Sequence, residues 1–405
     1  MDLPDSQRLL IRILGYQLFG GTKPSFENVD WSSLLAEAKK QAVFPLVFSC
    51  VEDELRQALS AQEFLAYEQR NAGFYSSAIR SRYDHDCVHK LLTQHGVPYV
   101  ILKGQATARY YPDPYCRSMG DVDVLVEPDN LDKVGSLLTA EGFREEEGSW
   151  RHPFHRTYLR HKTEVEVHWA VPGLPSEENE ALKRCLSGIL TDAVLVEEDD
   201  CSFLMPSPFH HGLILLLHTL SHQLRDGIGL RHLCDWLVFE DSFSDEAFRS
   251  LFQKPLQEIG LWTFAQVLTS VGIRFFGCAP KAWCAGADDQ LCEDYLMDIA
   301  SSGNFGGHNR TRLTHSRFYL NPEHPESTSD HFIKTGLAAV GHLARKRYPK
   351  LAKNPILFPI GCGFVVIPYL YRMARGKRVN PLKKDFRIAV SKRESLYSRL
   401  RLFKK

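Results

Sequence analysis

An alternation of acidic and valine residues constrains the fold of this chain more than any other feature of its sequence. Residues 120–126 read Gly-Asp-Val-Asp-Val-Leu-Val, and residues 164–169 read Glu-Val-Glu-Val-His-Trp. Side chains two residues apart lie on the same face of a β-strand, whereas a helix would scatter them around its axis. The period of two therefore predicts two β-strands, each with one polar and one apolar face.

Each predicted strand collects carboxylates on its polar face. Asp121 and Asp123 share that face in the first strand, and Glu164, Glu166 and His168 share it in the second. If the two strands are neighbours, several like charges crowd one patch, which is unfavourable unless cations neutralise them. Because hard carboxylate oxygens suit Mg²⁺ or Mn²⁺, the pattern predicts a divalent-metal site at this patch.

A third apolar segment, Tyr99 to Gly104, includes Lys103 and is followed by helix-forming residues from Gln105 to Tyr111. A strand, a glycine and a helix N-terminus together form an anion site, because unpaired backbone N–H groups point outward and the glycine lets a phosphate approach closely. Lys103 adds a positive charge beside that site. A phosphate site next to metal-binding carboxylates describes a pocket for a nucleoside triphosphate.

The order of these segments resembles the polymerase-β-like nucleotidyltransferase superfamily, and more closely a bacterial group known as uncharacterised nucleotidyltransferases. The resemblance rests on Leu-Lys-Gly at 102–104, Arg-Ser-Met-Gly-Asp-Val-Asp-Val-Leu-Val at 117–126, and Val-Glu-Val-His-Trp at 165–169. The third carboxylate, commonly Asp in that group, is Glu166 here, so its oxygens lie about one methylene further from the backbone.

The resemblance implies a metal-dependent enzyme that moves an NMP group from an NTP, such as ATP, to an acceptor hydroxyl and releases pyrophosphate. It implies that Asp121, Asp123 and Glu166 are catalytic residues and hold Mg²⁺ or Mn²⁺. The residues expected to contact the nucleotide are Lys103, Gly104, Arg117, Ser118 and Gly120. Arg117 lies on a loop, where a solvated charge is an equally good interpretation.

Helical periodicity surrounds the predicted sheet, so the expected fold class is α+β, with a small mixed-sheet nucleotidyltransferase domain between helical regions. Ser6 and Asp30 lie where helix N-caps belong, and one long helix is expected from Ala61 to Gln94. We expect four parts: an N-terminal helical subdomain (1–95), the nucleotidyltransferase core (96–205), a helical domain (206–340), and a basic C-terminal segment with an apolar stretch (341–405).

The helical region after Ser207 carries His218 and His222 one turn apart on a single face. Such a pair could ligate a metal, but no acidic or thiol partner stands at a recognised spacing. We therefore interpret the two residues as a buried or interface-facing pair. Arg231 and Asp235 share the same spacing and are interpreted as a structural ion pair, although the matching helix of the resembled group implies that they line the acceptor side of a cleft.

The zero net charge of the chain conceals a strong asymmetry. Residues 341–405 contain 18 Lys and Arg against 2 Asp and Glu, whereas the first 340 residues contain 31 against 47. The basic tail predicts an anionic partner: nucleic acid, a phospholipid surface or the acidic body of the chain itself. Its apolar stretch, 355–371, is interrupted by three prolines and two glycines, so we do not expect it to span a bilayer. We expect it to pack on the body, to lie at an anionic membrane surface or to form an oligomer contact.

Ten cysteines without a Cys-x-x-Cys pair predict reduced thiols, and Met1-Asp2-Leu3-Pro4-Asp5 lacks the pattern of a secretory signal. The expected location is the cytoplasm, and the basic tail also allows peripheral contact with the inner face of the membrane. The acidic body disfavours long duplex nucleic acid as the acceptor. A small molecule, a sugar, a protein or a tRNA end is expected in its place.

The competing function is a catalytically inactive binding or scaffold protein that keeps the nucleotidyltransferase fold and uses its basic tail to contact a membrane or a nucleic acid. The distances between the three predicted catalytic carboxylates distinguish the two functions. Paired-metal chemistry requires that carboxylate oxygens of Asp121, Asp123 and Glu166 converge to within about 5 Å, because paired ions lie about 3.5–4 Å apart.

Overall fold

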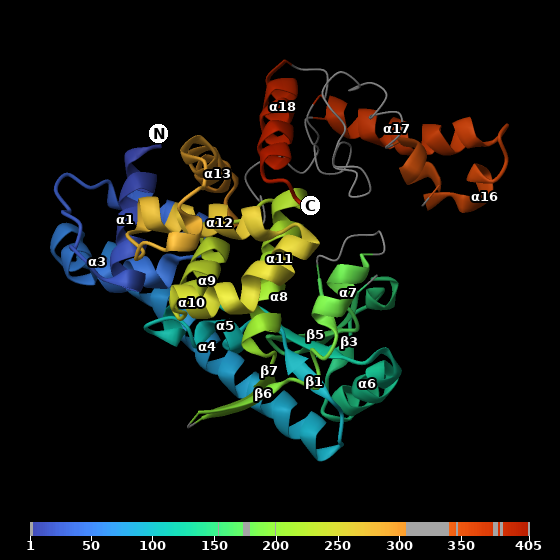
Figure 1. Cartoon of the computed structure of the whole chain (residues 1–405), viewed down its shortest axis with the longest axis horizontal. Coiled ribbons are helices and arrows are strands. Elements are labelled where there is room, and N and C mark those ends of the chain that lie inside the picture. The colour runs from blue at the N-terminus through green and yellow to red at the C-terminus, as the bar shows by residue number, and fades with distance from the viewer. Residues whose placement is uncertain are drawn as a thin grey trace.

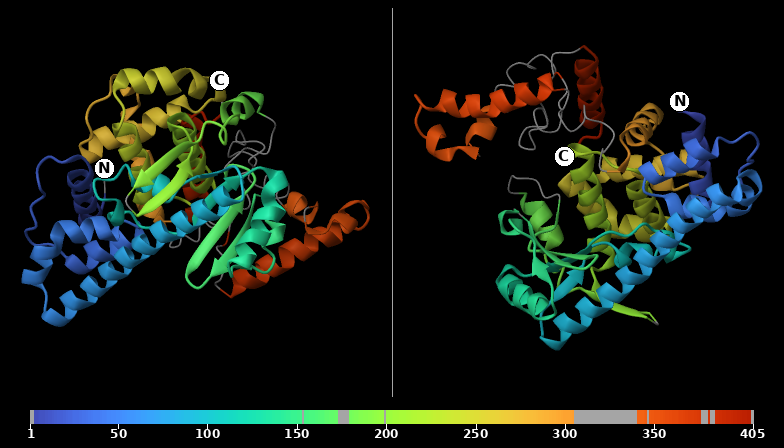
Figure 2. Two further views of the ribbon diagram at one scale, coloured as in Figure 1. Left: turned by 90° about the horizontal axis from the view of Figure 1, so that it is seen from below. Right: turned by 180° about the vertical axis from the view of Figure 1, so that it is seen from behind.

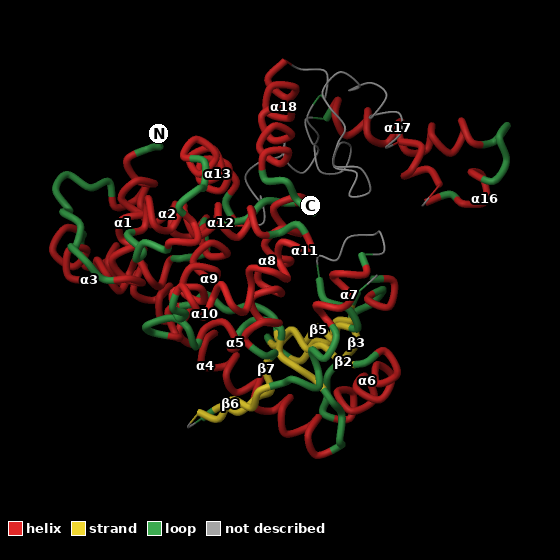
Figure 3. The backbone as a smooth tube through the Cα atoms, viewed as in Figure 1, coloured by secondary structure: helices red, strands yellow, loops and turns green. Residues whose placement is uncertain are grey.

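The computed structural model describes residues 3–152, 154–172, 179–198, 200–304, 340–345, 347–375, 380 and 384–403. Figure 1 shows a largely helical body with a small sheet beside it. Figure 3 shows the strands gathered at one side of the helices. The predicted α+β class is confirmed.

Five strands form the sheet that carries the alternating segments: β1 (Tyr99–Ile101), β2 (Val122–Val126), β3 (Arg144–Glu145), β4 (His155–Arg160) and β5 (Thr163–His168). Their order is β1-β2-β5-β4-β3, with β2 parallel to β5 and every other pair antiparallel. In the parallel pair Asp123 stands opposite Glu166. Both strands predicted from the alternation are therefore confirmed, and they are neighbours.

The apolar faces of β2 and β5 hold this register. Their valines share a hydrophobic cluster with Leu92 of α4 (Ala61–Gln94) and Leu138 of α6 (Leu131–Ala140). Burying each such side chain stabilises the fold by about 1.5–3 kcal/mol. A shift of one residue would turn Asp123 into this cluster, so the apolar face also fixes the direction of the polar face.

The long helix α4 connects the sheet to the helical body. Ser60 and Glu63 form a reciprocal capping box at its start, with Ser60 N donating to Glu63 Oε2 at 3.1 Å. Phe64 near one end belongs to the cluster of the helical body, whereas Leu92 near the other end belongs to the sheet cluster. Figure 2 shows α4 running along both regions. The predicted bounds of this helix are confirmed.

The other helices of the body, and the hairpin strands that pack beside α4, have the following bounds: α1 (Asp5–Phe19), α2 (Trp31–Lys40), α3 (Phe44–Ala58), α5 (Gln105–Ala108), α7 (Glu180–Leu186), β6 (Val194–Glu198), β7 (Cys201–Met205), α8 (Pro208–Arg225), α9 (Leu230–Asp241), α10 (Asp245–Phe248), α11 (Lys254–Ile259), α12 (Trp262–Val271) and α13 (Asp289–Ser302). Short 3-10 or π-helical segments link them: η1 (Pro114–Cys116), η2 (Pro128–Asn130), η3 (Ser149–Arg151), η4 (Arg249–Gln253), η5 (Gly272–Phe276) and η6 (Ala282–Cys284).

Two helix starts test the predicted N-caps. Asp30 caps α2, accepting a hydrogen bond from Ser33 N at 3.0 Å, so that prediction is confirmed. The prediction for Ser6 is wrong, because α1 begins at Asp5 and Pro4 occupies its N-cap position. The fixed φ of proline suits a helix start, and Asp5 places a negative charge in the first turn, where the helix dipole favours it.

One hydrophobic cluster unites the N-terminal helices with the helices that follow the sheet. It contains Leu14 of α1, Phe48 of α3, Leu216 of α8 and Leu268 of α12. Helices separated by more than 200 residues in the sequence thus bury their apolar faces against each other. The division into parts at residues 95, 205 and 340 stays a prediction.

The basic tail includes the helices α16 (Pro349–Ala352), α17 (Phe358–Ala374) and α18 (Lys384–Arg399). Helix α18 packs on the body, where Arg399 Nη1 lies 2.6 Å from Asp294 Oδ2 and Tyr397 Oη donates to Gln223 O at 2.8 Å. Part of the tail therefore pairs with the acidic body of the chain. Among the described helices, none is long and apolar enough to cross a membrane.

A buried histidine makes the stability of this fold depend on pH. His211 of α8 is fully buried, with its Nε2 3.4 Å from Thr107 Oγ1 and its ring stacked on Tyr110. Burial lowers the pKa of His211 to about 3, and burial lowers the pKa of His85 to about 4. Since both folded pKa values lie below the unfolded value, the unfolded chain binds more protons, and stability is lost as the pH falls below about 6.5.

We expect the free energy of unfolding to decrease by up to about 1.4 kcal/mol per pH unit for each of these two histidines as the pH falls from about 6.5 to 5.5. Urea unfolding at pH 7.5, 6.5 and 5.5 measures this slope. The variant His211→Gln cannot titrate and should show a smaller slope. An equal slope in both proteins would show that His211 does not cause it.

Candidate functional site

The polar faces of β2 and β5 line a cavity of about 280 Å³ whose opposite wall is formed by α8 and α9. Seven of the eight predicted site residues line this cavity: Lys103, Gly104, Arg117, Gly120, Asp121, Asp123 and Glu166. Ser118 is the exception. Its side chain is buried, its Oγ has no hydrogen-bond partner among the described residues, and its carbonyl oxygen accepts from Arg231 Nη1 at 3.1 Å.

The three predicted catalytic carboxylates converge in this cavity. One oxygen from each of Asp121, Asp123 and Glu166 lies within 4.8 Å of the others. Asp123 is buried, whereas Asp121 and Glu166 are partly exposed. The distance meets the condition of about 5 Å set above for paired-metal chemistry.

Two basic side chains hold Asp123 in its ionised form. Lys103 Nζ lies 3.0 Å from Asp123 Oδ2, and His168 Nε2 lies 3.0 Å from Asp123 Oδ1. Burial opposes ionisation of Asp123, but Lys103 and His168 outweigh it and lower the pKa of Asp123. Burial likewise disfavours charged His168, but its hydrogen bonds to Asp123 and Glu166 raise its pKa. The folded chain thus partly neutralises its own acidic cluster.

Asp121 shows that this neutralisation is incomplete. The negative charge of Asp123 raises the pKa of Asp121, and burial adds to the effect, whereas Lys103 acts in the opposite direction. Residual repulsion between neighbouring carboxylates is what a divalent cation relieves. The donor set of three carboxylates and the repulsion at Asp121 therefore fit Mg²⁺ or Mn²⁺.

Gly104 brings the end of β1 close to a buried histidine. Its φ of 63° lies in the left-handed region, and a Cβ atom there would lie 2.9 Å from His85 Nε2. Both the conformation and the close approach require glycine. The helix after it is a single turn, α5 (Gln105–Ala108), so the predicted extent to Tyr111 is wrong. A helix of one turn has a small dipole, so at the predicted phosphate site the helix N-terminus contributes less than the sequence suggests.

Arg117 is anchored to α9 by a buried, bidentate salt bridge. Its Nε and Nη2 donate to Asp235 Oδ1 and Oδ2 at 2.8 and 2.9 Å, and Tyr111 Oη donates to Oδ1 at 2.7 Å. Burial opposes both charges, but each partner outweighs it, so the pKa of Arg117 is raised and the pKa of Asp235 is lowered. The interpretation of Arg117 as a solvated loop charge is wrong, while its contact with a nucleotide stays a prediction.

The salt bridge of Asp235 joins two parts of the chain that are distant in sequence. The sequence predicts Arg231, one turn earlier on α9, as its partner, whereas the structure gives Asp235 a bidentate bond with Arg117 from the loop before β2. Arg231 in turn donates to the carbonyl oxygen of Ser118 on the same loop. Helix α9 is therefore fastened to the predicted nucleotide loop at two points.

Six histidines line the cavity, and none of them belongs to the predicted set of site residues: His152, His155, His168, His218, His222 and His232. His155 Nδ1 lies 3.3 Å from Glu166 Oε2, and burial lowers the pKa of His155 to about 4, so this ring is neutral near pH 7. His155 pairs with His168 across β4 and β5. If the register of β4 against β5 had been known, His155 would have been predicted to lie beside Glu166. The sequence alone does not give this register.

Comparison with known proteins identifies the family. A family model described as uncharacterised nucleotidyltransferase matches residues 27–277, more than half of the 405 residues. The chain belongs to this family of nucleotidyltransferases. No curated protein and no solved structure gave a match. Every residue that lines the cavity lies within the matched region, so the resemblance stated from the motifs is confirmed for the part of the chain that forms the site.

We expect Asp235→Ala to lower the free energy of unfolding by about 3–5 kcal/mol, because it leaves the charge of Arg117 buried without its partner. Glu52→Ala is the matched control, since it breaks an exposed ion pair with Arg56 and should cost at most about 1 kcal/mol. Chemical denaturation followed by tryptophan fluorescence measures both changes. Equal, small losses would show that the buried pair does not fasten α9 to the sheet.

Proposed function

We propose that this nucleotidyltransferase moves an NMP group from an NTP to an acceptor hydroxyl, releases pyrophosphate and depends on Mg²⁺ or Mn²⁺. The observation that carries the proposal is the convergence of Asp121, Asp123 and Glu166 to within 4.8 Å in a cavity of the family-matched region. Membership of the family supports nucleotidyl transfer in general. The geometry supports the choice of residues and metal.

Each cavity residue has a role in this proposal. Asp121 and Asp123 would hold the metal ions, and Glu166 would complete the second site or accept the proton of the acceptor. Bound divalent ions would offset the negative charge on the attacking and leaving oxygens. Lys103 lies 3.0 Å from Asp123, and a triphosphate oxygen would offer its ammonium group a second anionic partner. Backbone groups at Gly104 and Gly120 would let the phosphates approach closely.

The proposed transfer balances as an in-line displacement. The acceptor oxygen forms a bond with the α-phosphorus while the bond from that phosphorus to the bridging oxygen of the β-phosphate breaks. Pyrophosphate leaves, and the hydroxyl proton passes to Glu166 or to water. Glu166 is partly exposed to the cavity, and its neighbour His155 is neutral near pH 7, so a proton can reach this carboxylate.

The acceptor stays within the predicted classes: a small molecule, a sugar, a protein or a tRNA end. Tyr397 of the basic α18 donates to the carbonyl oxygen of Gln223, and the preceding residue, His222, lines the cavity. The tail thus folds back onto a helix of the site. This contact weakens the electrostatic argument against an anionic acceptor, because the body around the site does not act alone.

The basic tail also supports the second candidate function, contact with an anionic membrane surface. Helix α17 exposes half or more of Ile360, Phe364, Ile367 and Tyr371, which recur at helical spacing along one face. Arg372 follows on the same helix. An apolar face beside basic residues suits the boundary between lipid headgroups and acyl chains. We propose that α17 lies at such a surface, whether or not the enzyme is active.

We expect Asp123→Asn to lower nucleotidyl transfer on the order of 100-fold or more, because it removes a metal-binding charge worth several kcal/mol in the transition state. The assay follows α-labelled NTPs with Mg²⁺ and total tRNA, cell protein or metabolite extract as acceptors. Asp132→Asn, an exposed carboxylate outside the cavity, is the control and should keep full activity. Transfer at the wild-type rate by Asp123→Asn would contradict the proposal.

A second variant avoids the buried charges that Asp123→Asn leaves behind. A Cβ atom at Gly120 would meet no atom within 4 Å, so Gly120→Val should fold normally. Its side chain would take up space in the cavity that the proposal assigns to the nucleotide. We expect a KM for NTP raised about tenfold or more, corresponding to at least about 1.4 kcal/mol of lost binding. An unchanged KM would place the nucleotide elsewhere.

We expect the full-length protein to bind vesicles that contain phosphatidylserine and to bind phosphatidylcholine vesicles weakly, with binding that decreases as salt increases. Phe364→Glu should weaken binding about tenfold or more, because it removes roughly 1.5–3 kcal/mol of apolar burial and adds a negative charge. Ile79→Glu is the control, since Ile79 is exposed on α4. Equal weakening by both variants in a flotation assay would rule out α17 as the contact.

A further inference from the structure

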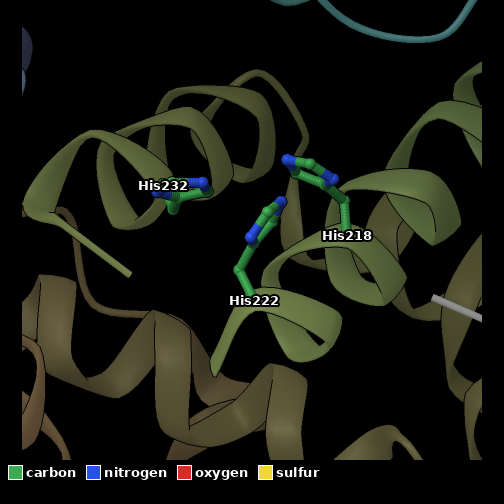
Figure 4. A group of neighbouring side chains, drawn as sticks. All are labelled: His218, His222 and His232. Atoms are coloured by element: carbon green, nitrogen blue, oxygen red, sulfur yellow. The ribbon is translucent and has the colours of Figure 1, made fainter. Parts of the chain in front are cut away.

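Three histidines meet on the helical wall of the cavity. His218 and His222 come from consecutive turns of α8, and His232 comes from the start of α9 (Figure 4). One nitrogen atom of each ring lies within 4.8 Å of the other two. The ring centroids of His218 and His222 are 4.5 Å apart, and each lies 5.6 Å from that of His232. The structure therefore supplies the third partner that the sequence pattern lacked.

The burial of these rings differs in a way that defines an open side. His232 is almost fully buried, whereas His222 keeps partial exposure, and all three histidines line the cavity. The Nδ1 atom of His218 is inaccessible to solvent and has no hydrogen-bond partner among the described residues. A buried polar atom without a partner costs about 1–3 kcal/mol. A metal ion bound to this atom would remove that cost.

We propose that His218, His222 and His232 bind one Zn²⁺ or a similar divalent transition metal, with an open coordination position toward the cavity. Imidazole nitrogens suit Zn²⁺, whereas Mg²⁺ selects oxygen ligands, so this site differs in chemistry from the acidic cluster. Three protein ligands and one exchangeable position are typical of open zinc sites, while structural sites use four protein ligands. Water or another exchangeable ligand would take the open position.

The surrounding geometry and charges allow this assignment. Zn–N bonds are about 2.0–2.1 Å long, so nitrogens bound to one zinc ion lie closer together than the 4.8 Å within which these three nitrogens are found. Side-chain rotations that move the nitrogens by on the order of 1 Å would close this gap. Lys103 lines the same cavity and would repel a cation, but its charge is paired with Asp123 at 3.0 Å. Arg117 is likewise paired with Asp235. Arg225 and Arg231 also line the cavity, and with burial and Lys103 they disfavour protonation of these histidines, so the rings are neutral, which is the form that binds a metal.

This inference does not depend on the proposed nucleotidyl transfer, because its ligands lie outside the acidic cluster and no nucleotide is needed to test it. Purified full-length protein is incubated with Zn²⁺ and desalted, and its metal content is measured. We expect about one ion per chain in the wild-type protein and about none in His222→Gln and His232→Gln. Asp123→Asn and His95→Gln, an exposed histidine outside the cavity, should keep the ion.

The pattern of loss decides between the two clusters. No retained zinc in the wild-type protein would overturn the inference, as would zinc kept by both His variants. Loss in Asp123→Asn alone would also overturn it, because the ion would then belong to the carboxylates. Circular dichroism shows whether each variant folds. The metal content of a variant that does not fold is disregarded, and a direct measurement on the wild-type protein decides instead.

X-ray absorption at the zinc edge provides that measurement without any variant. We expect three nitrogen neighbours at about 2.0–2.1 Å and one further light atom, and a shell of oxygens alone or one containing sulfur would contradict the assignment. The open position is tested with the Co²⁺-substituted protein. Azide should change its visible spectrum by entering the fourth position, whereas an unchanged spectrum would show a closed site.

Discussion

A buried carboxylate at the centre of the sheet determines both the fold and the site. Asp123 bonds through one oxygen to Lys103 at the end of β1 and through the other to His168 of β5. Three neighbouring strands must therefore stay in one register, because a shift of one residue would move Asp123 among the valines and leave two cations without their partner. The contact that stabilises the sheet is also the one that gathers charge in the cavity.

A second buried ion pair sets the opposite wall. The bidentate bond between Arg117 and Asp235 joins the loop before β2 to α9, and Arg231 binds the same loop through the carbonyl oxygen of Ser118. Helices that follow the sheet in sequence are thereby held against its polar face. Because each pair satisfies its charges inside the protein, the cavity between them keeps partly exposed polar groups on both walls.

Sequence patterns predicted the features of the fold that depend on residues close together in the sequence. The period of two gave β2 and β5, helical periodicity gave α4, and the motif order gave the family and the converging carboxylates. Features set by distant contacts escaped the sequence. Asp235 bonds to a residue 118 positions earlier, and the pair His218 and His222 gained His232 only through the packing of α8 on α9. Periodicity carries no information on such partners, because it describes one element at a time.

Two helices of the basic tail, α18 and α17, have different surroundings. In α18, Arg399 and Arg393 lie against Asp294 and Asp298 of α13, so this part of the tail neutralises the acidic body. Helix α17 instead exposes apolar side chains that the described body does not cover. The cavity divides in a similar way: its sheet wall carries the three carboxylates together with His155 and His168, whereas its helical wall groups three histidines. Since hard and borderline cations prefer different donors, the Mg²⁺ proposed for the carboxylates and the Zn²⁺ proposed for the three histidines of α8 and α9 would not compete for one site.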